Sequence, residues 1–241
     1  MSRRSSLICA FAAVVGLAAG FWIASYRAAL PEQVKAAFHV LYHKQGNSTY
    51  NSTYWLGVPA QKCPLDMWSF QEILYETKPD VLVEMGTFKG GSAYFFASIF
   101  DLLKHGRVVT VDIEDFPGKP QHERITYLLG SSTSAEIVAK VRSLIAPGER
   151  VIVVLDSDHH RDHVLNELRL YNGLVSPGCY LIVEDTHFNG HPILPKFGPG
   201  PMEAVDEFLG TNTAFVRDRT RERFLMTFNP GGYLKRAKLY K

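Results

Sequence analysis

Short apolar runs and amphipathic stretches alternate along most of the chain after residue 65. Five of the runs are almost continuously apolar, which is typical of strands buried on both faces of a sheet. These runs are DVLVEMG (80–86), RVVTVD (107–112), ITYLLG (125–130), RVIVVLD (150–156) and CYLIVED (179–185). The other stretches have apolar residues at helical spacing, and they predict helices over 66–77, 90–106, 134–145, 163–174 and 201–210.

Strands that alternate with helices predict a doubly wound α/β domain with a mostly parallel sheet. Asp66 is expected to cap the first of the helices, because an aspartate side chain accepts hydrogen bonds from the free N–H groups at a helix start. Two further apolar runs, 214–218 and 223–230, lie close together near the end of the chain. They predict an antiparallel pair of strands at one edge of the sheet.

The amino-terminal stretch LICAFAAVVGLAAGFWIA (7–24) is uncharged and follows Arg3 and Arg4. As a helix it is long enough to cross most of a hydrocarbon core of roughly 30 Å. We interpret it as an uncleaved apolar membrane helix that gives the protein a membrane-associated location. A cleaved signal peptide and a helix buried against a partner are the alternatives. The expected organisation is an anchor or signal-like segment over 1–30, a connecting segment over 31–65 and a main domain over 66–241.

Composition narrows the function classes. Hydrophobic residues make up 46% of the 241 residues, which is enough for a sizeable core, and the net charge of +2 is small. No stripe of lysine and arginine with interleaved aromatic residues is present, so a nucleic-acid partner is not expected. The tandem NSTYNSTY contains N-glycosylation tripeptides at Asn47 and Asn51, although we favour a plain polar loop there. A homo-oligomer is left open.

The turn after the first predicted strand, VEMGTFKGGS (83–92), indicates a cofactor site. In open α/β sheets ligands bind beyond the carboxyl ends of the strands, and this turn lacks the Gly-x-Gly-x-x-Gly order of a dinucleotide site. Gly86 still permits close approach of a ligand, Ser92 offers a hydroxyl at the next helix start, and Asp112 ends the following strand. The combination favours an adenosine cofactor without a diphosphate, such as S-adenosylmethionine. The alternative is a plain strand-to-helix turn with Asp112 as a cap.

Acidic residues at the ends of the fourth and fifth predicted strands indicate a metal site. Asp156, Glu184 and Asp185 come from sequential strands, and their carboxylates would repel one another without a cation. Oxygen ligands suit Mg²⁺, which acidifies a bound hydroxyl. His159 is the candidate base for that proton. The alternative for each residue is ordinary, since a strand-end aspartate is often a helix cap and a histidine in a turn is often structural.

Four segments together resemble the rhamnosyl O-methyltransferase and cephalosporin hydroxylase-like family, which consists of class I S-adenosylmethionine-dependent methyltransferases. The segments are DMWSFQEIL, GTFKGGSAYFFA, LDSDHHRDHVLNEL and YLIVEDTHFNGHPILPKFGPGPMEAVDEF. The resemblance covers roughly residues 40–232 and implies a Rossmann-like methyltransferase fold.

The resemblance also implies roles for individual residues. Asp156, Glu184 and Asp185 would bind Mg²⁺, and the spacing of these three acids is similar to that in catechol O-methyltransferases. Those enzymes have a lysine where this chain has His159, and a neutral imidazole is a competent base near pH 7 in its place. By the resemblance, the methionine part of the cofactor would be held by Glu84, Gly86 and Ser92, the ribose by Asp112, and the adenine by the surroundings of Ser131 and Ser132. Thr87 and Asp156 are further implied cofactor contacts.

The predicted function is Mg²⁺-dependent methyl transfer from S-adenosylmethionine to a hydroxyl of a sugar or glycolipid. The catalytic domain is expected in the cytosol, where the cofactor is found. An iron-dependent hydroxylase using His159, Asp156 and Glu184 is one alternative, and a non-catalytic, membrane-tethered binding protein is another. The Gly- and Pro-rich stretch 188–201 is interpreted as a substrate loop, with a rigid crossover as the alternative.

Overall fold

The structure is a computed structural model that describes residues 30–44 and 49–238. The chain divides into two compact units, Met1–Leu41 and Tyr42–Lys241. Residues 30–44 are helical. The second unit contains the sheet, and it begins upstream of residue 66, because the segment that precedes that residue packs on the same core.

A seven-stranded sheet forms the centre of the second unit, in the order β5-β4-β3-β6-β7-β9-β8. All pairs from β5 to β7 are parallel, and β9 is antiparallel to both β7 and β8. The strands are β3 (Val81–Met85), β4 (Arg107–Asp112), β5 (Ile125–Leu129), β6 (Val151–Leu155), β7 (Tyr180–Val183), β8 (Phe215–Arg217) and β9 (Tyr233–Arg236). The predicted doubly wound, mostly parallel sheet is therefore confirmed.

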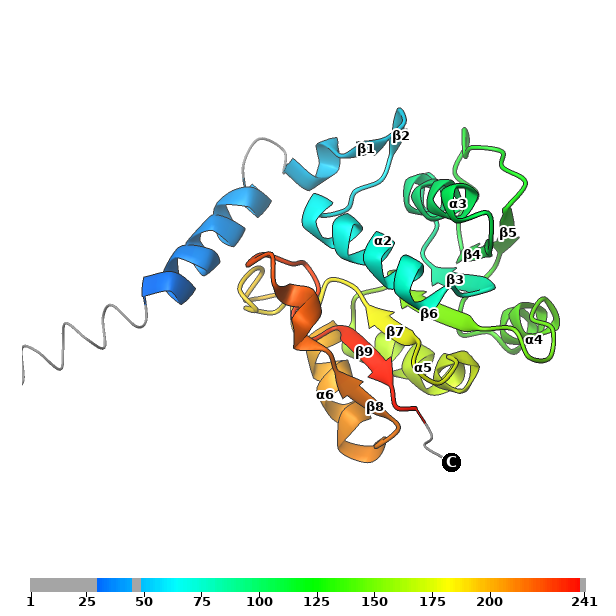
Figure 1. Cartoon of the computed structure of the whole chain (residues 1–241). Coiled ribbons are helices and arrows are strands. Elements are labelled where there is room, and N and C mark those ends of the chain that lie inside the picture. The colour runs from blue at the N-terminus through cyan, green and yellow to red at the C-terminus, as the bar shows by residue number, and fades with distance from the viewer. Residues whose placement is uncertain (1–29, 45–48, 239–241) are drawn as a thin grey trace, which may run out of the picture. The chain divides into compact units, whose positions relative to one another are not determined.

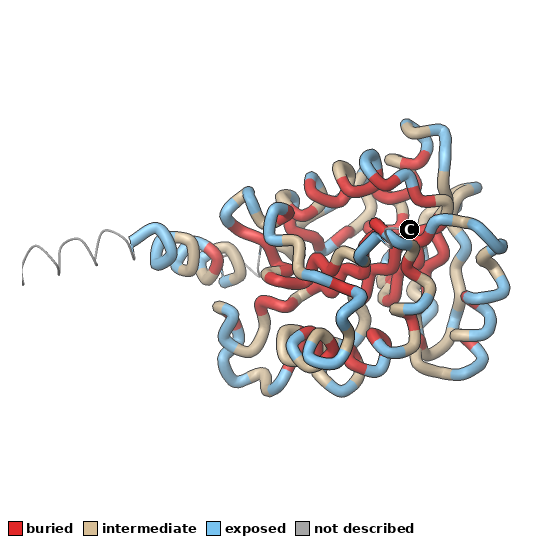
Figure 2. Tube along the Cα trace, turned by 60° about the horizontal axis from the view of Figure 1, so that its bottom comes forward, coloured by how far each residue is buried: buried red, intermediate tan, exposed pale blue. Residues whose placement is uncertain are grey.

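Helices cover both faces of this sheet, with α2 and α3 on one side and α4, α5 and α6 on the other (Figure 1). Every residue of β3, β6 and β7 is buried, which explains why these segments are apolar without alternation (Figure 2). The helices are α2 (Pro64–Thr77), α3 (Gly91–Leu103), α4 (Ala135–Ser143), α5 (Arg161–Tyr171) and α6 (Pro201–Thr211). The smaller elements are η1 (Thr49–Ser52), β1 (Tyr54–Trp55), β2 (Val58–Pro59), η2 (Asn172–Leu174) and η3 (Arg219–Glu222).

The strand predicted over 223–230 is wrong, and the antiparallel partner of β8 is β9 instead. Residues 223–230 form turns and irregular backbone. Met226 and Phe228 are buried in a small cluster with Cys63, so this run is apolar because it packs under the start of α2. The backbone N–H of Phe228 donates to Asp66 at 2.8 Å, which replaces the strand hydrogen bond that the pattern predicts.

The prediction that Asp66 caps the first helix is also wrong. Helix α2 begins at Pro64 with Cys63 at the capping position, and Asp66 lies in the first turn, where it is buried. Its carboxylate accepts from Thr227 Oγ1 at 2.5 Å and from Tyr233 Oη at 2.8 Å, besides the Phe228 amide. A buried carboxylate needs such donors, because without them its desolvation is costly. Asp66 therefore connects α2 to the end of the chain.

The structure contradicts the predicted membrane-associated location. Within residues 30–44 and 49–238, no helix combines the length and the apolar character needed to cross a membrane. The apolar stretch 7–24, on which the prediction of an apolar amino-terminal helix depended, lies outside the described residues.

Candidate active site

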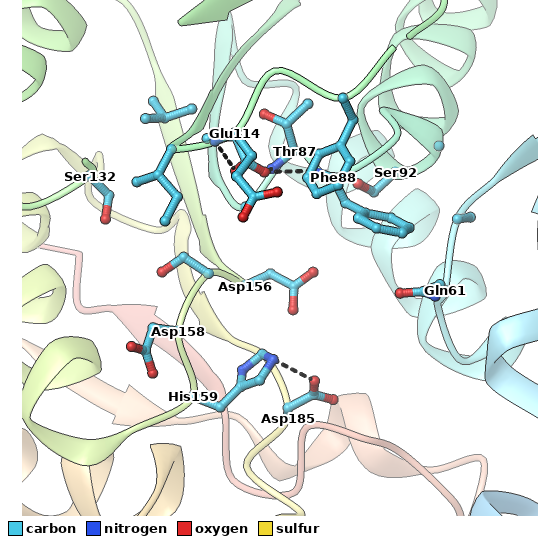
Figure 3. A pocket seen from close by; sticks show the side chains of 18 of the residues that line it. Gln61, Thr87, Phe88, Ser92, Glu114, Ser132, Asp156, Asp158, His159 and Asp185 are labelled. Carbon is cyan, nitrogen blue, oxygen red and sulfur yellow. Dashed lines mark hydrogen bonds and ion pairs between the residues drawn. The ribbon is translucent and has the colours of Figure 1, made fainter. Parts of the chain in front are cut away.

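A cavity of about 700 Å³ lies at the carboxyl ends of β3, β4, β6 and β7. The chain order of the sheet reverses between β3 and β6, and such a switch point leaves a crevice in which α/β proteins bind ligands. Figure 3 shows Thr87, Phe88, Ser92 and Glu114 on one side of the cavity and His159 with Asp185 on the other. Asp156 projects between these two groups, so the cavity has two halves that meet at one carboxylate.

Gly86 makes the turn after β3 possible. Its φ is +97°, and a Cβ atom at this position would lie 1.9 Å from the backbone oxygen of Asp156. The backbone amide of Asp156 in turn donates to Met85 O at 2.8 Å. The ends of β3 and β6 therefore touch through backbone atoms, and only glycine fits between them.

Asp112 organises the turn on the β4 side of the cavity. Its Oδ2 accepts from the amides of Thr87 and Phe88 at 2.9 and 2.7 Å, and its Oδ1 accepts from Glu114 N at 2.9 Å. A carboxylate has about four acceptor sites, so three backbone donors leave room for a ligand hydroxyl. Asp112 also lines the cavity. A loop-organising role and a ligand-binding role are thus compatible for this residue.

Glu84 lies beneath the glycine turn and is completely buried. Its Oε2 accepts from Thr110 Oγ1 at 2.7 Å, and Thr110 Oγ1 is also 2.6 Å from Thr87 Oγ1. Burial raises the pKa of Glu84 to about 7. Its Oε1 has no hydrogen-bond partner within the described part of the chain. Such an oxygen could accept from a cationic ligand group near the turn, where Ser92 lines the cavity, although Glu84 itself is not among the described residues that line it.

A polar network that the sequence did not reveal lies behind Ser131 and Ser132. Both serines line the cavity, and Ser132 Oγ donates to Glu167 Oε1 at 2.5 Å. Ser157 Oγ donates to the same oxygen at 2.7 Å, and His163 Nε2 lies 3.2 Å from it. This contact raises the pKa of His163. The feature of the sequence that could have indicated this network is Glu167, a charged residue at a core-facing position of an amphipathic helix.

Asp156, His159 and Asp185 form the acidic half of the cavity. One ligand atom from each lies within 4.8 Å of the others, a separation suited to a metal ion. His159 Nε2 lies 3.3 Å from Asp185 Oδ2, and His187 Nε2 lies 3.2 Å from Asp185 Oδ1 (Figure 3). Burial would raise the pKa of Asp185, but the two histidines and Lys62 outweigh burial and lower it. Asp185 is therefore ionised at the edge of the cavity.

Glu184, the third predicted metal ligand, is not part of this cluster. Its Oε1 accepts from Lys62 Nζ at 2.7 Å, and Lys62 also donates to Asp156. Neither Glu184 nor Lys62 is among the described residues that line the cavity. Lys62 comes from the segment PAQKCP, far from both acids in sequence, so neither periodicity nor spacing could have revealed it.

Aromatic rings line the cavity next to the acidic half. His187 stacks on Phe188 with ring centroids 5.0 Å apart and contacts Phe228 at 4.4 Å. His43 stacks on Tyr50 at 5.2 Å, and all five residues line the cavity. These ring faces offer an apolar surface close to the polar groups of Asp156 and Asp185, which is the mixture typical of small-molecule sites.

The side chain of Glu203 holds several residues of the stretch 188–201. Glu203 in the first turn of α6 accepts from Gly200 N at 2.7 Å and Asn189 Nδ2 at 3.0 Å, and lies 2.9 Å from His191 Nε2. These contacts outweigh the effect of burial and lower the pKa of Glu203 to about 2. Phe188 is the residue of this stretch that lines the cavity.

The chain is similar to proteins of a known family. Residues 47–237 match the rhamnosyl O-methyltransferase/CmcI family. A rhamnosyl O-methyltransferase of Mycobacterium tuberculosis (strain ATCC 25618 / H37Rv) is 38% identical over 246 residues, which cover 97% of each chain. One from Mycobacterium leprae (strain TN) is 39% identical over 207 residues, covering 81% of this chain and 89% of the relative.

Solved structures of similar fold include CmcI. A CmcI structure solved with Mg and SAM has a TM-score of 0.61 and 21% sequence identity, and the match covers 79% of this chain and 78% of that chain. A CmcI apo-structure gives the same values. At this level of identity the similarity concerns the fold.

Proposed function

Because this chain belongs to the rhamnosyl O-methyltransferase/CmcI family, we propose that it methylates a sugar hydroxyl in an Mg²⁺-dependent reaction. The enzyme class, an S-adenosylmethionine-dependent O-methyltransferase, follows from the family and from the full-length relatives, so that part of the prediction is confirmed. These relatives are O-methyltransferases and do not support the alternative of an iron-dependent hydroxylase. The observation that carries the proposal is one cavity in which a glycine turn and an acid-histidine cluster share Asp156.

S-adenosylmethionine fits the half of the cavity around Gly86. The unpartnered Oε1 of buried Glu84 is an acceptor suited to an ammonium group, and Asp112 has a free acceptor site suited to a ribose hydroxyl. Thr87 and Ser92 lie beside the turn, and Ser131 and Ser132 line the wall beyond β5. When bound there, the cofactor supplies an electrophilic methyl group.

The acidic half fits Mg²⁺, because carboxylate oxygens are its preferred protein ligands. Asp156 and Asp185 would hold the ion, and Glu184 would join them if Lys62 released it. When bound, Mg²⁺ supplies positive charge that orients the acceptor hydroxyl and makes it more acidic.

His159 is assigned the removal of the acceptor proton. A ring nitrogen of His159 would accept the proton that the acceptor hydroxyl loses when it takes the methyl group that the cofactor would supply. Asp185 Oδ2, 3.3 Å from Nε2, then stabilises the imidazolium. The ring also contacts Phe188 edge-on at a centroid distance of 5.1 Å, which restricts its orientation.

The proposed sugar class depends on the relatives' names and on the aromatic side of the cavity. A pyranose has apolar C–H faces and polar hydroxyl edges, so it could contact Phe188 and Tyr50 while a hydroxyl approaches Asp156 and Asp185. The predicted glycolipid acceptor depended on membrane association, which the described residues do not support.

The test is methyl transfer by the full-length chain with labelled S-adenosylmethionine. We expect label on a rhamnoside, no label on the matched analogue that lacks the accepting hydroxyl, and loss of transfer with chelator that added Mg²⁺ restores. If chelator leaves turnover unchanged, the reaction does not depend on Mg²⁺. If no hydroxylated glycoside accepts the methyl group, the acceptor is not a sugar.

Replacing His159 by alanine should lower kcat by about 10²- to 10⁴-fold, the usual effect of losing a general base. Binding of S-adenosylmethionine, measured by calorimetry, should stay near that of the unaltered protein. His160→Ala is the matched control, because its ring is exposed, pairs with Asp158 and stacks on Phe197 outside the cavity. Equal losses in the two variants would argue against His159 as the base.

A further inference from the structure

Lys62 is a buried lysine that lies directly behind the acidic half of the cavity. Only 4% of the residue is exposed, although the preceding residue, Gln61, faces the cavity (Figure 3). Its ammonium group donates to Asp156 and, at 2.7 Å, to Glu184. Lys62 therefore joins the ends of β6 and β7 to a segment that precedes the sheet in sequence.

The charge balance of this region depends on Lys62. Asp156, Glu184 and Asp185 bring three carboxyl groups together, and Asp156 and Glu184 share the same ammonium ion as their partner. Removing this ammonium charge would leave the buried carboxyl group of Glu184 and the partly buried one of Asp156 without a counter-charge, which is costly.

The same two carboxyl groups are the ones that a divalent ion needs. Glu184 Oε1 is not available to an ion beside Asp156 and Asp185 while it accepts from Lys62, and Oδ2 of Asp156 is engaged in the same way. We propose that Lys62 is an internal cation that competes with the divalent metal ion for Asp156 and Glu184, and thereby weakens metal binding. This inference rests on the proposed metal site and adds a positioning residue that the proposed reaction does not require.

The competition also couples the metal site to the cavity wall. Lys62 follows Pro59, Ala60 and Gln61, which line the cavity, and its backbone amide donates to Thr53 Oγ1 at 3.0 Å. Release of Lys62 from Asp156 would therefore act on a segment that also lines the cavity.

The test is calorimetric titration of Mg²⁺, and of Mn²⁺ as a second ion, into the full-length protein and two variants. Lys62→Met keeps a similar side-chain length and removes the charge, and we expect it to bind metal at least tenfold more tightly, equal to about 1.4 kcal/mol. Lys140→Met removes one exposed lysine on α4, away from the cavity, and should stay within twofold of the unaltered protein. Metal should also raise the melting temperature of Lys62→Met more than that of the unaltered protein.

A crystal structure of the unaltered protein with Mn²⁺ keeps the test decisive if Lys62→Met does not fold. We expect Asp156 to bind the ion, and we expect Lys62 Nζ to lie beyond hydrogen-bond distance of the Asp156 carboxylate. An ion on Asp156 with Lys62 still bound to it, or equal or weaker binding by a folded Lys62→Met, would overturn the inference alone. If the unaltered protein binds neither ion and methyl transfer needs none, the proposed metal site fails with it.

Discussion

Replacing Asp156 by asparagine is expected to lower kcat/KM for methyl transfer by about 10³-fold. Asp156 is the residue that the two halves of the cavity share, and it lies with His159 and Asp185 in the candidate metal cluster. Asparagine keeps the size of the side chain but removes its charge. Charge stabilisation by a metal contributes several kcal/mol to a transition state, and each 1.36 kcal/mol corresponds to a tenfold change in rate.

Asp158→Asn is the matched control for this substitution. Asp158 also lines the cavity and is two residues away, but its half-exposed carboxylate accepts from the backbone and ring of His160. We expect its activity to stay within about threefold, since an exposed pair of this kind contributes little. Initial rates at varied Mg²⁺ would compare the two variants, and full activity of Asp156→Asn would contradict the assigned metal site.

Gly86→Ala is expected to be the most damaging substitution for folding and cofactor binding. The new methyl group would lie 1.9 Å from the backbone oxygen of Asp156, and backbone atoms cannot yield as a flexible side chain can. The positive φ of +97° adds strain for any residue other than glycine. We expect about 3 to 5 kcal/mol of lost stability, as for severe overpacking with strain, and no measurable binding of S-adenosylmethionine.

Gly118→Ala separates the clash from the backbone strain. Gly118 also has a positive φ, of +79°, but a Cβ atom there would meet nothing within 4 Å. Its loss of stability should therefore be only about 1 kcal/mol, the cost of the left-handed conformation. Urea unfolding and calorimetry with S-adenosylmethionine would measure both variants. Equal effects would mean that strain alone, and not the contact between β3 and β6, explains the need for glycine.

The apolar pattern predicted the parallel strands well, because strands buried on both faces must be apolar throughout. It failed at 223–230, where burial against α2 makes an irregular segment as apolar as a strand. The true last strand, β9, ends in Lys235 and Arg236, which are only partly buried and gave it a weaker apolar signal. Periodicity reports burial, and burial has more than one structural cause.

The acidic residues predicted to bind metal show the same limit of sequence-based prediction. Their place at strand ends was evident from the sequence, since parallel strands bring their carboxyl ends to one edge of a sheet. Which way each side chain turns was not: Glu184 and Asp185 are neighbours, yet one faces Lys62 and the other faces the cavity. Strand β7 ends at Val183, and Asp185 has a positive φ of +54°, so the chain leaves the extended conformation here and the two side chains take different directions.

By itself, the sequence determined the sheet of alternating strands and helices, the glycine turn with Asp112, and the strand-end residues Asp156, His159 and Asp185, because these depend on local pattern and chain order. Only the tertiary structure decided that Lys62 neutralises Asp156 and Glu184 and that Glu167 lies behind the serines. Contacts of this second kind join residues distant in sequence, and they follow from how buried charges find partners when the layers pack.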